Sequence, residues 1–189
     1  ISSRQNQLLK VQQQLSSELK ISTPADDPAA AVKVLNLNAT IDKTKQYQSN
    51  ISTARGRLTS EDAALGAASD LLLRTRELAI KAQNSNLTNN DRLTIKGEVD
   101  LMIQEMAGVA NTQNANGEYI FSGDLSTVAP YAIQPVTGQY VYQGGPQQRA
   151  LQIGPTRQVA DSDLGLNVFE NIVSSSPAAD ENGNRSVFN

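Results

Sequence analysis

The 189-residue sequence contains no histidine, no cysteine and no tryptophan, and these absences exclude several classes of chemistry. Without cysteine and histidine there is no thiolate nucleophile, no Ser-His-Asp triad, no zinc-finger ligand set and no disulfide framework. A formal net charge of −3 argues against a nucleic-acid binder, because lysine and arginine supply most of that affinity. No apolar run reaches the roughly 18 residues of a membrane span, and no secretory leader is recognisable. We therefore expect no enzyme, no cofactor and no metal, and neither nucleic acid nor membrane as a partner.

Aromatic residues are scarce in the first 110 residues, which hold only Tyr47, whereas residues 111–189 hold the other seven. Glycine divides in the same sense, four against eight, and the net charge is +1 in the first part and −4 in the second. The chain therefore combines two kinds of structure.

The first kind is predicted to be helical. Residues 1–21 carry Leu8, Val11, Leu15 and Leu19 at helical spacing, which indicates one apolar face. This helix should end before Pro24, because proline disfavours helix at the residue before it. Asp26, Asp27 and Pro28 then form a start signal, since aspartate accepts free amides at a helix start and proline fits the first turn.

A second, very long helix is predicted over 28–84, which contains no proline after Pro28. One row repeats every seven residues, and a companion row three residues later is small and weakly apolar. The strong row is Leu37, Thr44, Ile51, Leu58, Leu65, Leu72 and Ala79. Such a helix is about 85 Å long, whereas a compact globule of this size is about 40 Å across. We therefore expect an elongated rod.

A third helix is predicted over 89–113, folded back against the end of the second. Thr88 and Asp91 have the spacing of a capping box. The apolar face is Ile95, Val99, Met102, Met106 and Val109.

The second kind of structure is predicted to be β. Short segments at 118–122, 131–136, 139–143 and 149–153 are rich in aromatic or β-branched residues and are separated by glycine or proline. The expected fold class is thus α+β, a rod of long antiparallel helices with a small β-rich lobe that has its own core. The expected domains are a helical rod over 1–116, a lobe over 117–173 and a linker or disordered tail over 174–189.

Several polar groups have both a functional and a simpler interpretation. Asp26 and Asp27 are better explained by capping than by catalysis. The segment 161–165 lacks the glycine and glutamate that a calcium loop requires. Arg74, Arg76 and Glu77 fit a solvated face with an i,i+3 pair, or alternatively a protein-contact patch.

The leucine row also leaves two alternatives open, an intramolecular core or a subunit interface. Three helices leave part of the row uncovered, which favours a partner helix. The residues expected to pack the rod or form an interface are Ile51, Leu58, Leu65, Leu72, Met102 and Met106.

Two stretches resemble the flagellar hook-associated protein 3 family, the hook–filament junction branch of the flagellin superfamily. One is residues 22–30 with the helix that includes 76–79, and the other is residues 116–123, Asn-Gly-Glu-Tyr-Ile-Phe-Ser-Gly. Flagellin shares the helical part but usually lacks a proline after the aspartate pair, and reads more like Phe-Asn-Gly where this chain has 119–123.

The resemblance implies an extracellular structural subunit of the bacterial flagellum, exported by the flagellar type III system. Its implied partners are hook-associated protein 1, flagellin and further copies of itself in a ring. The chain resembles a core fragment without the terminal regions that pair as a coiled coil in the family, so we expect a monomer in solution. Flagellin itself, an enzyme on the β lobe, or a generic coiled-coil module are the alternatives, of which flagellin is the strongest.

Overall fold

The computed structural model describes residues 2–17, 27–173, 184–185 and 187. It divides into two compact units, an N-terminal unit over Ile1–Ser49 and a C-terminal unit over Asn50–Asn189. The division expected at residue 116 stays a prediction.

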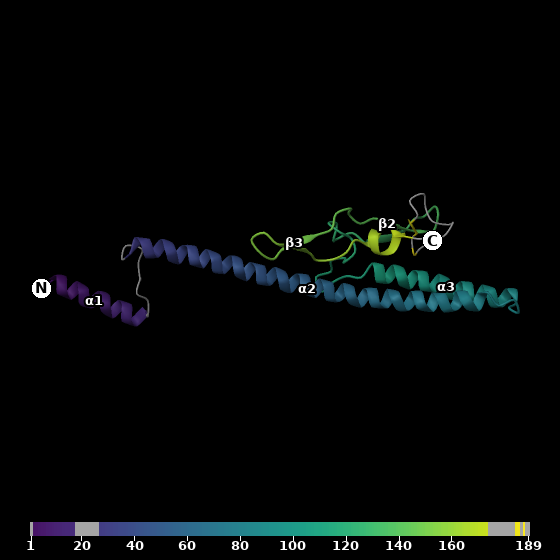
Figure 1. Cartoon of the computed structure of the whole chain (residues 1–189), viewed down its shortest axis with the longest axis horizontal. Helices are drawn as coiled ribbons and strands as arrows, with labels where there is room; N and C mark the ends of the chain where they lie inside the picture. The colour runs from purple at the N-terminus through teal and green to yellow at the C-terminus, as the bar shows by residue number, and fades with distance from the viewer. Residues whose placement is uncertain (1, 18–26, 174–183, 186, 188–189) are drawn as a thin grey trace. The chain divides into compact units, whose positions relative to one another are not determined.

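The described residues include three α-helices: α1 (Ser2–Ser17), α2 (Pro28–Ala82) and α3 (Asn89–Ala110). A small antiparallel β lobe follows them along the chain (Figure 1). The expected fold class, long helices with a small β-rich lobe, is confirmed in these terms. Among the described residues, no helix combines the length and apolarity needed to cross a membrane.

Helix α2 begins where proline and aspartate together satisfy its first turn. The Oδ1 atom of Asp27 accepts the amide of Ala30 at 3.0 Å, and its carbonyl accepts the amide of Ala31 at 2.9 Å. Pro28 is the first helical residue and has no amide to satisfy. Pro24 and Asp26 lie outside the described residues.

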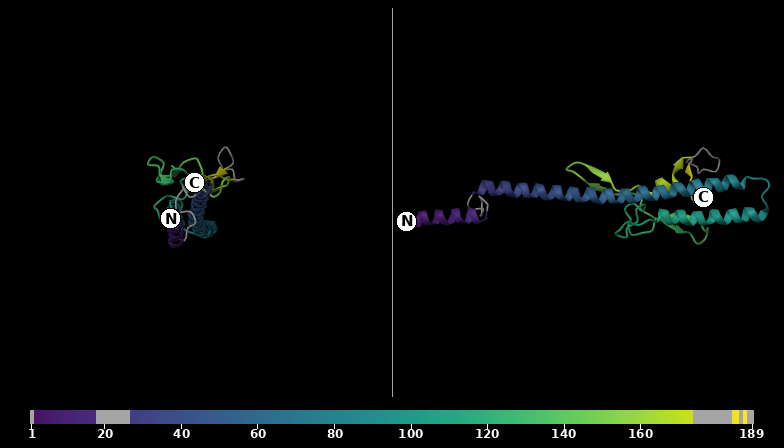
Figure 2. Two further views of the ribbon diagram at one scale, coloured as in Figure 1. Left: turned by 90° about the vertical axis from the view of Figure 1, so that its left-hand side faces the viewer. Right: turned by 90° about the horizontal axis from the view of Figure 1, so that it is seen from below.

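Helix α3 begins with a reciprocal capping box. Thr88 Oγ1 accepts the amide of Asp91 at 3.2 Å, while Asp91 Oδ2 accepts the amide of Thr88 at 2.9 Å. The helix runs back beside the C-terminal half of α2 (Figures 1 and 2). Thr75 Oγ1 of α2 contacts Met102 Sδ of α3 at 3.4 Å.

Three antiparallel strand pairs form the lobe. Strand β1 (Tyr131–Ile133) pairs with β2 (Tyr140–Tyr142), and β3 (Ala150–Gln152) pairs with β4 (Gln158–Ala160). Strand β5 (Ile172–Val173) pairs with β6 (Asn184–Arg185). A π-helical turn, Leu166–Glu170, precedes β5.

Two parts of the lobe differ from expectation. Residues 118–122 form bends with one isolated bridge, Gln113 to Tyr119, instead of a strand, because their backbone groups bond to several separate loops. Residues 184–185 form β6 inside the stretch expected to be linker or tail, and the amide of Val187 donates to Phe169 O at 2.7 Å. The intervening residues 174–183 lie outside the described part of the chain.

The lobe does not have a separate core. Four of its buried side chains form one cluster with alanines of α2 and α3: Ile120, Phe121, Tyr131 and Phe169. Phe169 meets Phe121 and Tyr131 edge to face, with ring centroids 5.2 and 5.8 Å apart. The helical alanines in the cluster are Ala64, Ala68, Ala107 and Ala110. Small helical side chains leave room for large aromatic ones, so helices and lobe share one interior.

Candidate assembly surface

The strong leucine row of α2 is largely on the surface of the protein. Ile51, Leu58 and Leu72 retain 40%, 42% and 47% of their accessible surface. The buried residues of α2 come from the companion row and its neighbour instead: Ala54, Arg57, Glu61, Ala64, Ala68 and Leu78. Ile51, Leu58 and Leu72 therefore do not form an intramolecular core, which was one of the two alternatives for the leucine row.

Other residues expected to pack the rod are at least partly covered. Leu65 is half-buried against the shared core, and Met106 belongs to it. Met102 is half-buried, and its sulfur accepts a hydrogen bond from the Thr75 hydroxyl. Leu65, Met102 and Met106 therefore contribute to packing within the C-terminal unit. Ile51, Leu58 and Leu72 instead leave apolar surface accessible to solvent.

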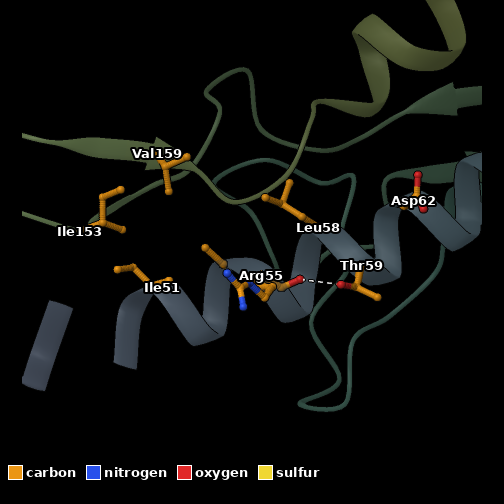
Figure 3. Close-up of a pocket in the computed structure, with 8 residues that line it drawn as sticks. Ile51, Arg55, Leu58, Thr59, Asp62, Ile153 and Val159 are labelled. Atoms are coloured by element: carbon orange, nitrogen blue, oxygen red, sulfur yellow. Dashed lines mark hydrogen bonds between the residues drawn. The ribbon is translucent and has the colours of Figure 1, made fainter. Parts of the chain in front are cut away.

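An apolar groove follows the leucine row where the β3–β4 hairpin passes over α2. Ile51 and Leu58 form one wall, and Ile153 and Val159 face them from the hairpin (Figure 3). The hollow between the two walls has a volume of about 440 Å³. Its polar lining includes Arg55 and Asp62, so the groove is an apolar channel with one charge of each sign.

The predicted contact patch is exposed. Arg74 Nη1 lies 3.2 Å from Glu77 Oε2, with 58% and 69% of their side chains accessible. Arg76 is also exposed on α2. An exposed i,i+3 pair stabilises a helix only slightly, about 0.3 kcal/mol. The geometry fits the solvated-face interpretation and leaves all three side chains accessible to a partner.

A charged cluster that was not predicted from the sequence joins α2 to the lobe. Arg57 of α2, 3% exposed, contacts Glu118 through Nη1 and Asp161 through Nε, the latter at 3.1 Å. Arg149, beside β3, contacts the same two carboxylates at 3.4 and 2.7 Å. Two arginines and two carboxylates thus close a ring, which we call the charged ring, that joins α2 to three lobe segments.

A hydrogen bond from Asn114 supports Glu118 in the ring. The side-chain amide of Asn114 donates to Glu118 Oε2 at 2.9 Å, and this bond, opposed by burial and assisted by both arginines, lowers the pKa of Glu118. Asp161, the first residue of the segment weighed as a calcium loop, forms ion pairs with Arg57 and Arg149. No group of acidic side chains within the described residues has the arrangement of a metal site.

Glu61 lies one turn after Arg57 on the buried face of α2. Its Oε1 atom accepts the amide of Asp163 at 2.8 Å, while Oε2 is buried without a hydrogen-bond partner. Burial raises the pKa of this carboxyl group. The sequence did contain a signal for this cluster: Arg57 and Glu61 are spaced i,i+4 in helical rows that otherwise hold small or apolar residues. Charges in such rows are buried and need charged or hydrogen-bonding partners, which the lobe supplies.

Residues 1–126 match the family model described as the bacterial flagellin N-terminal helical region. Among curated proteins, flagellar hook-associated protein 3 of Escherichia coli is 26% identical over 189 residues, 100% of this chain and 58% of that protein. The Salmonella typhimurium protein of the same name is 25% identical over 92% of this chain and 54% of its own length. A flagellin of Clostridium tyrobutyricum is 29% identical but covers 62% of this chain.

Solved structures agree with these sequence relatives. The crystal structure of flagellar hook-associated protein 3 from Legionella pneumophila superposes with a TM-score of 0.70 and 34% identity, over 75% of this chain and 42% of that one. Xanthomonas campestris FlgL superposes with a TM-score of 0.66 and 28% identity, over 70% and 43%. The chain thus spans little more than half the length of the curated relatives it matches.

Proposed function

The chain belongs to the bacterial flagellin family, and on that premise we propose that it is a structural subunit of the flagellum, an adaptor at the hook–filament junction. The observation that carries this proposal is the extent of the similarity. Proteins named flagellar hook-associated protein 3 match 92–100% of the chain, including the β lobe. The flagellin of Clostridium tyrobutyricum matches only 62%.

The chemistry of the surface supports a role in packing between subunits. The exposed side chains of Ile51, Leu58 and Leu72 follow one side of a long helix, and accessible apolar rows of this kind are typical of protein contacts. We propose that this row, with the groove at Ile51 and Leu58, faces another helix in the assembled flagellum. Arg74, Arg76 and Glu77 are proposed to lie at the polar edge of that contact.

The proposed partners are hook-associated protein 1 on the hook side, flagellin on the filament side, and further copies of the same subunit in a ring. The proposed location is extracellular, after export by the flagellar type III system. The family is one of flagellar structural proteins, and we propose no catalytic role and no cofactor for this member.

Filament subunit, the role of flagellin itself, is the second candidate, because flagellins share the helical region. Deletion of the gene in the source bacterium separates the two. Loss of a junction adaptor should leave flagellin secreted into the medium without attached filaments, whereas loss of flagellin should leave none to secrete. Complementation with the intact gene is the control. Normal filaments in the deletion strain would contradict both roles.

A further inference from the structure

The β3–β4 hairpin has little packing of its own. Each strand has three residues, and the side chains of Ala150, Gln152 and Gln158 are exposed while the others are half-buried. No residue of the hairpin belongs to the shared core described above. An isolated two-stranded hairpin is marginally stable in water, so this one depends on what anchors it to the rest of the protein.

The apolar contact between the hairpin and α2 is loose. Ile153 and Val159 face Ile51 and Leu58 across the hollow of about 440 Å³ (Figure 3). Side chains that line a hollow lack the dispersion contacts that close packing would give them. Packing therefore holds the outer part of the hairpin only weakly.

The polar anchors, in contrast, are concentrated at the base of the hairpin. Arg149 directly precedes β3 and Asp161 directly follows β4, and both belong to the charged ring. The amide of Asp161 also donates to Arg149 O at 3.2 Å, which closes the hairpin at the same point. One hydrogen bond lies nearer the turn, where Asn50 Nδ2 of α2 donates to Gln152 O at 2.6 Å.

We propose that the hairpin from Arg149 to Asp161 is a strap that the charged ring latches onto α2. When the latch breaks, the strap lifts as a unit while the α2–α3 core stays folded, and Ile51 and Leu58 become fully accessible. The ring suits this role, because removal of one partner leaves a buried charge uncompensated.

The charges that face the latch come from four segments of the protein. Helix α2 contributes Arg57 and Glu61, the turn after α3 contributes Glu118, and the hairpin base contributes Arg149 and Asp161. Asp163 follows the hairpin and its charge raises the pKa of Glu61 further. Because folding lowers the pKa of Glu118, its ionised carboxylate stabilises the folded protein at pH values above the pKa of the unfolded chain. This stabilisation is lost as the pH falls through the pKa of the folded protein. Strong acid should therefore open the latch.

Hydrogen exchange of individual amides in the intact protein tests the strap. The reporters are the amides of Ile153 and Asp161 in the hairpin, which donate to Arg157 O and Arg149 O, and those of Ile95 and Met106 in α3. In Arg149→Met, protection at the hairpin reporters should fall about 10- to 100-fold, as expected for lost hydrogen bonds to charged groups. Protection in α3 should not change.

Arg157→Met is the matched control, because it removes the same charge from the exposed turn of the same hairpin. It should leave all four reporters unchanged. The proposal is overturned if Arg149→Met leaves the hairpin reporters unchanged, if hairpin and α3 lose protection equally, or if Arg157→Met has the same effect as Arg149→Met. Glu118→Gln provides an independent second variant, with the same expected selectivity for the hairpin.

Discussion

At the scale of single residues, Glu61 is a position where burial opposes ionisation of the side chain. Its side chain is 4% exposed, and one of its carboxylate oxygens has no hydrogen-bond partner. Burial raises its pKa, the amide of Asp163 lowers it, and the charges of Asp163 and Asp161 raise it again. An acid whose pKa is raised by folding destabilises the fold when ionised, and this penalty disappears as the pH falls towards the unfolded value.

Glu61→Gln should therefore stabilise the protein at pH 7, by on the order of 1 kcal/mol, because it removes a buried charge and retains an acceptor for the Asp163 amide. The advantage should shrink as the pH is lowered towards 4.5, the ordinary pKa of a glutamate, because the raised pKa of Glu61 means that its carboxyl group becomes protonated above that value. Urea unfolding at both pH values measures it. Asp62→Asn, which removes the same charge from an exposed neighbour, is the control, and an equal gain there would contradict the explanation.

At the scale of secondary-structure elements, the capping box of Thr88 and Asp91 stabilises the start of α3. Thr88 accepts the amide of Asp91 and so satisfies a donor that the helix leaves free. Thr88→Ala should lower the free energy of unfolding by about 1 kcal/mol. Thr94→Ala is the matched control, because Thr94 lies at an exposed position within α3 and its hydroxyl donates to the carbonyl of Asn90 in the preceding turn. Equal losses in chemical denaturation would show that the cap contributes nothing specific.

The half-buried part of the leucine row stabilises the helix pair. Leu65 packs against the shared core, so Leu65→Asp would bring an unpaired charge against apolar side chains. We expect a loss of about 2 kcal/mol or more, and a melting temperature lower by several degrees in circular dichroism. Ala63→Asp introduces the same charge at an exposed position of α2 and should melt close to the wild type. Unchanged melting of Leu65→Asp would refute a packing role.

The helices were predictable from the sequence because their signals are local. Asp27 and Pro28 start α2, and Thr88 and Asp91 start α3, through contacts within one turn. The lobe was less predictable, because its pairings are not local. The carbonyl of Phe121 accepts the amide of Gly165 at 2.9 Å, a contact that no pattern around residues 118–122 encodes. These residues form bends where their aromatic and β-branched side chains indicated a strand.

The choice of buried face on α2 was unpredictable for the same reason. Heptad spacing identifies which residues share a side of a helix, and the larger side chains suggested a leucine seam. The bulk of Phe121, Tyr131 and Phe169, which arrive from distant segments, instead selects the alanine side. The sequence thus predicted the leucine row as a surface feature only through the argument that three helices leave it partly uncovered.

At the scale of the whole molecule, the uncovered leucine row is the feature that we propose links the fold with assembly. The shared core is built on the small residues of α2, whereas Ile51, Leu58 and Leu72 keep much of their surface accessible. These three residues should therefore contribute little to the free energy of folding. A change in this row should therefore separate the two properties, because the subunit should still fold but should no longer assemble. This separation distinguishes a packing subunit from a protein whose leucines serve its own core.

Leu72→Asp is the sharpest test of that separation. Leu72 is 47% exposed, so the variant should keep its helical circular dichroism, and its stability should stay within about 0.5 kcal/mol of the wild type. In a strain that lacks the chromosomal gene, it should fail to restore attached filaments, and flagellin should accumulate in the medium. Ala63→Asp carries the same charge on another exposed side of α2 and should complement normally. A folded Leu72→Asp that restores filaments as well as Ala63→Asp would remove the leucine row from the assembly contact, because a buried aspartate at a helix interface would not be tolerated.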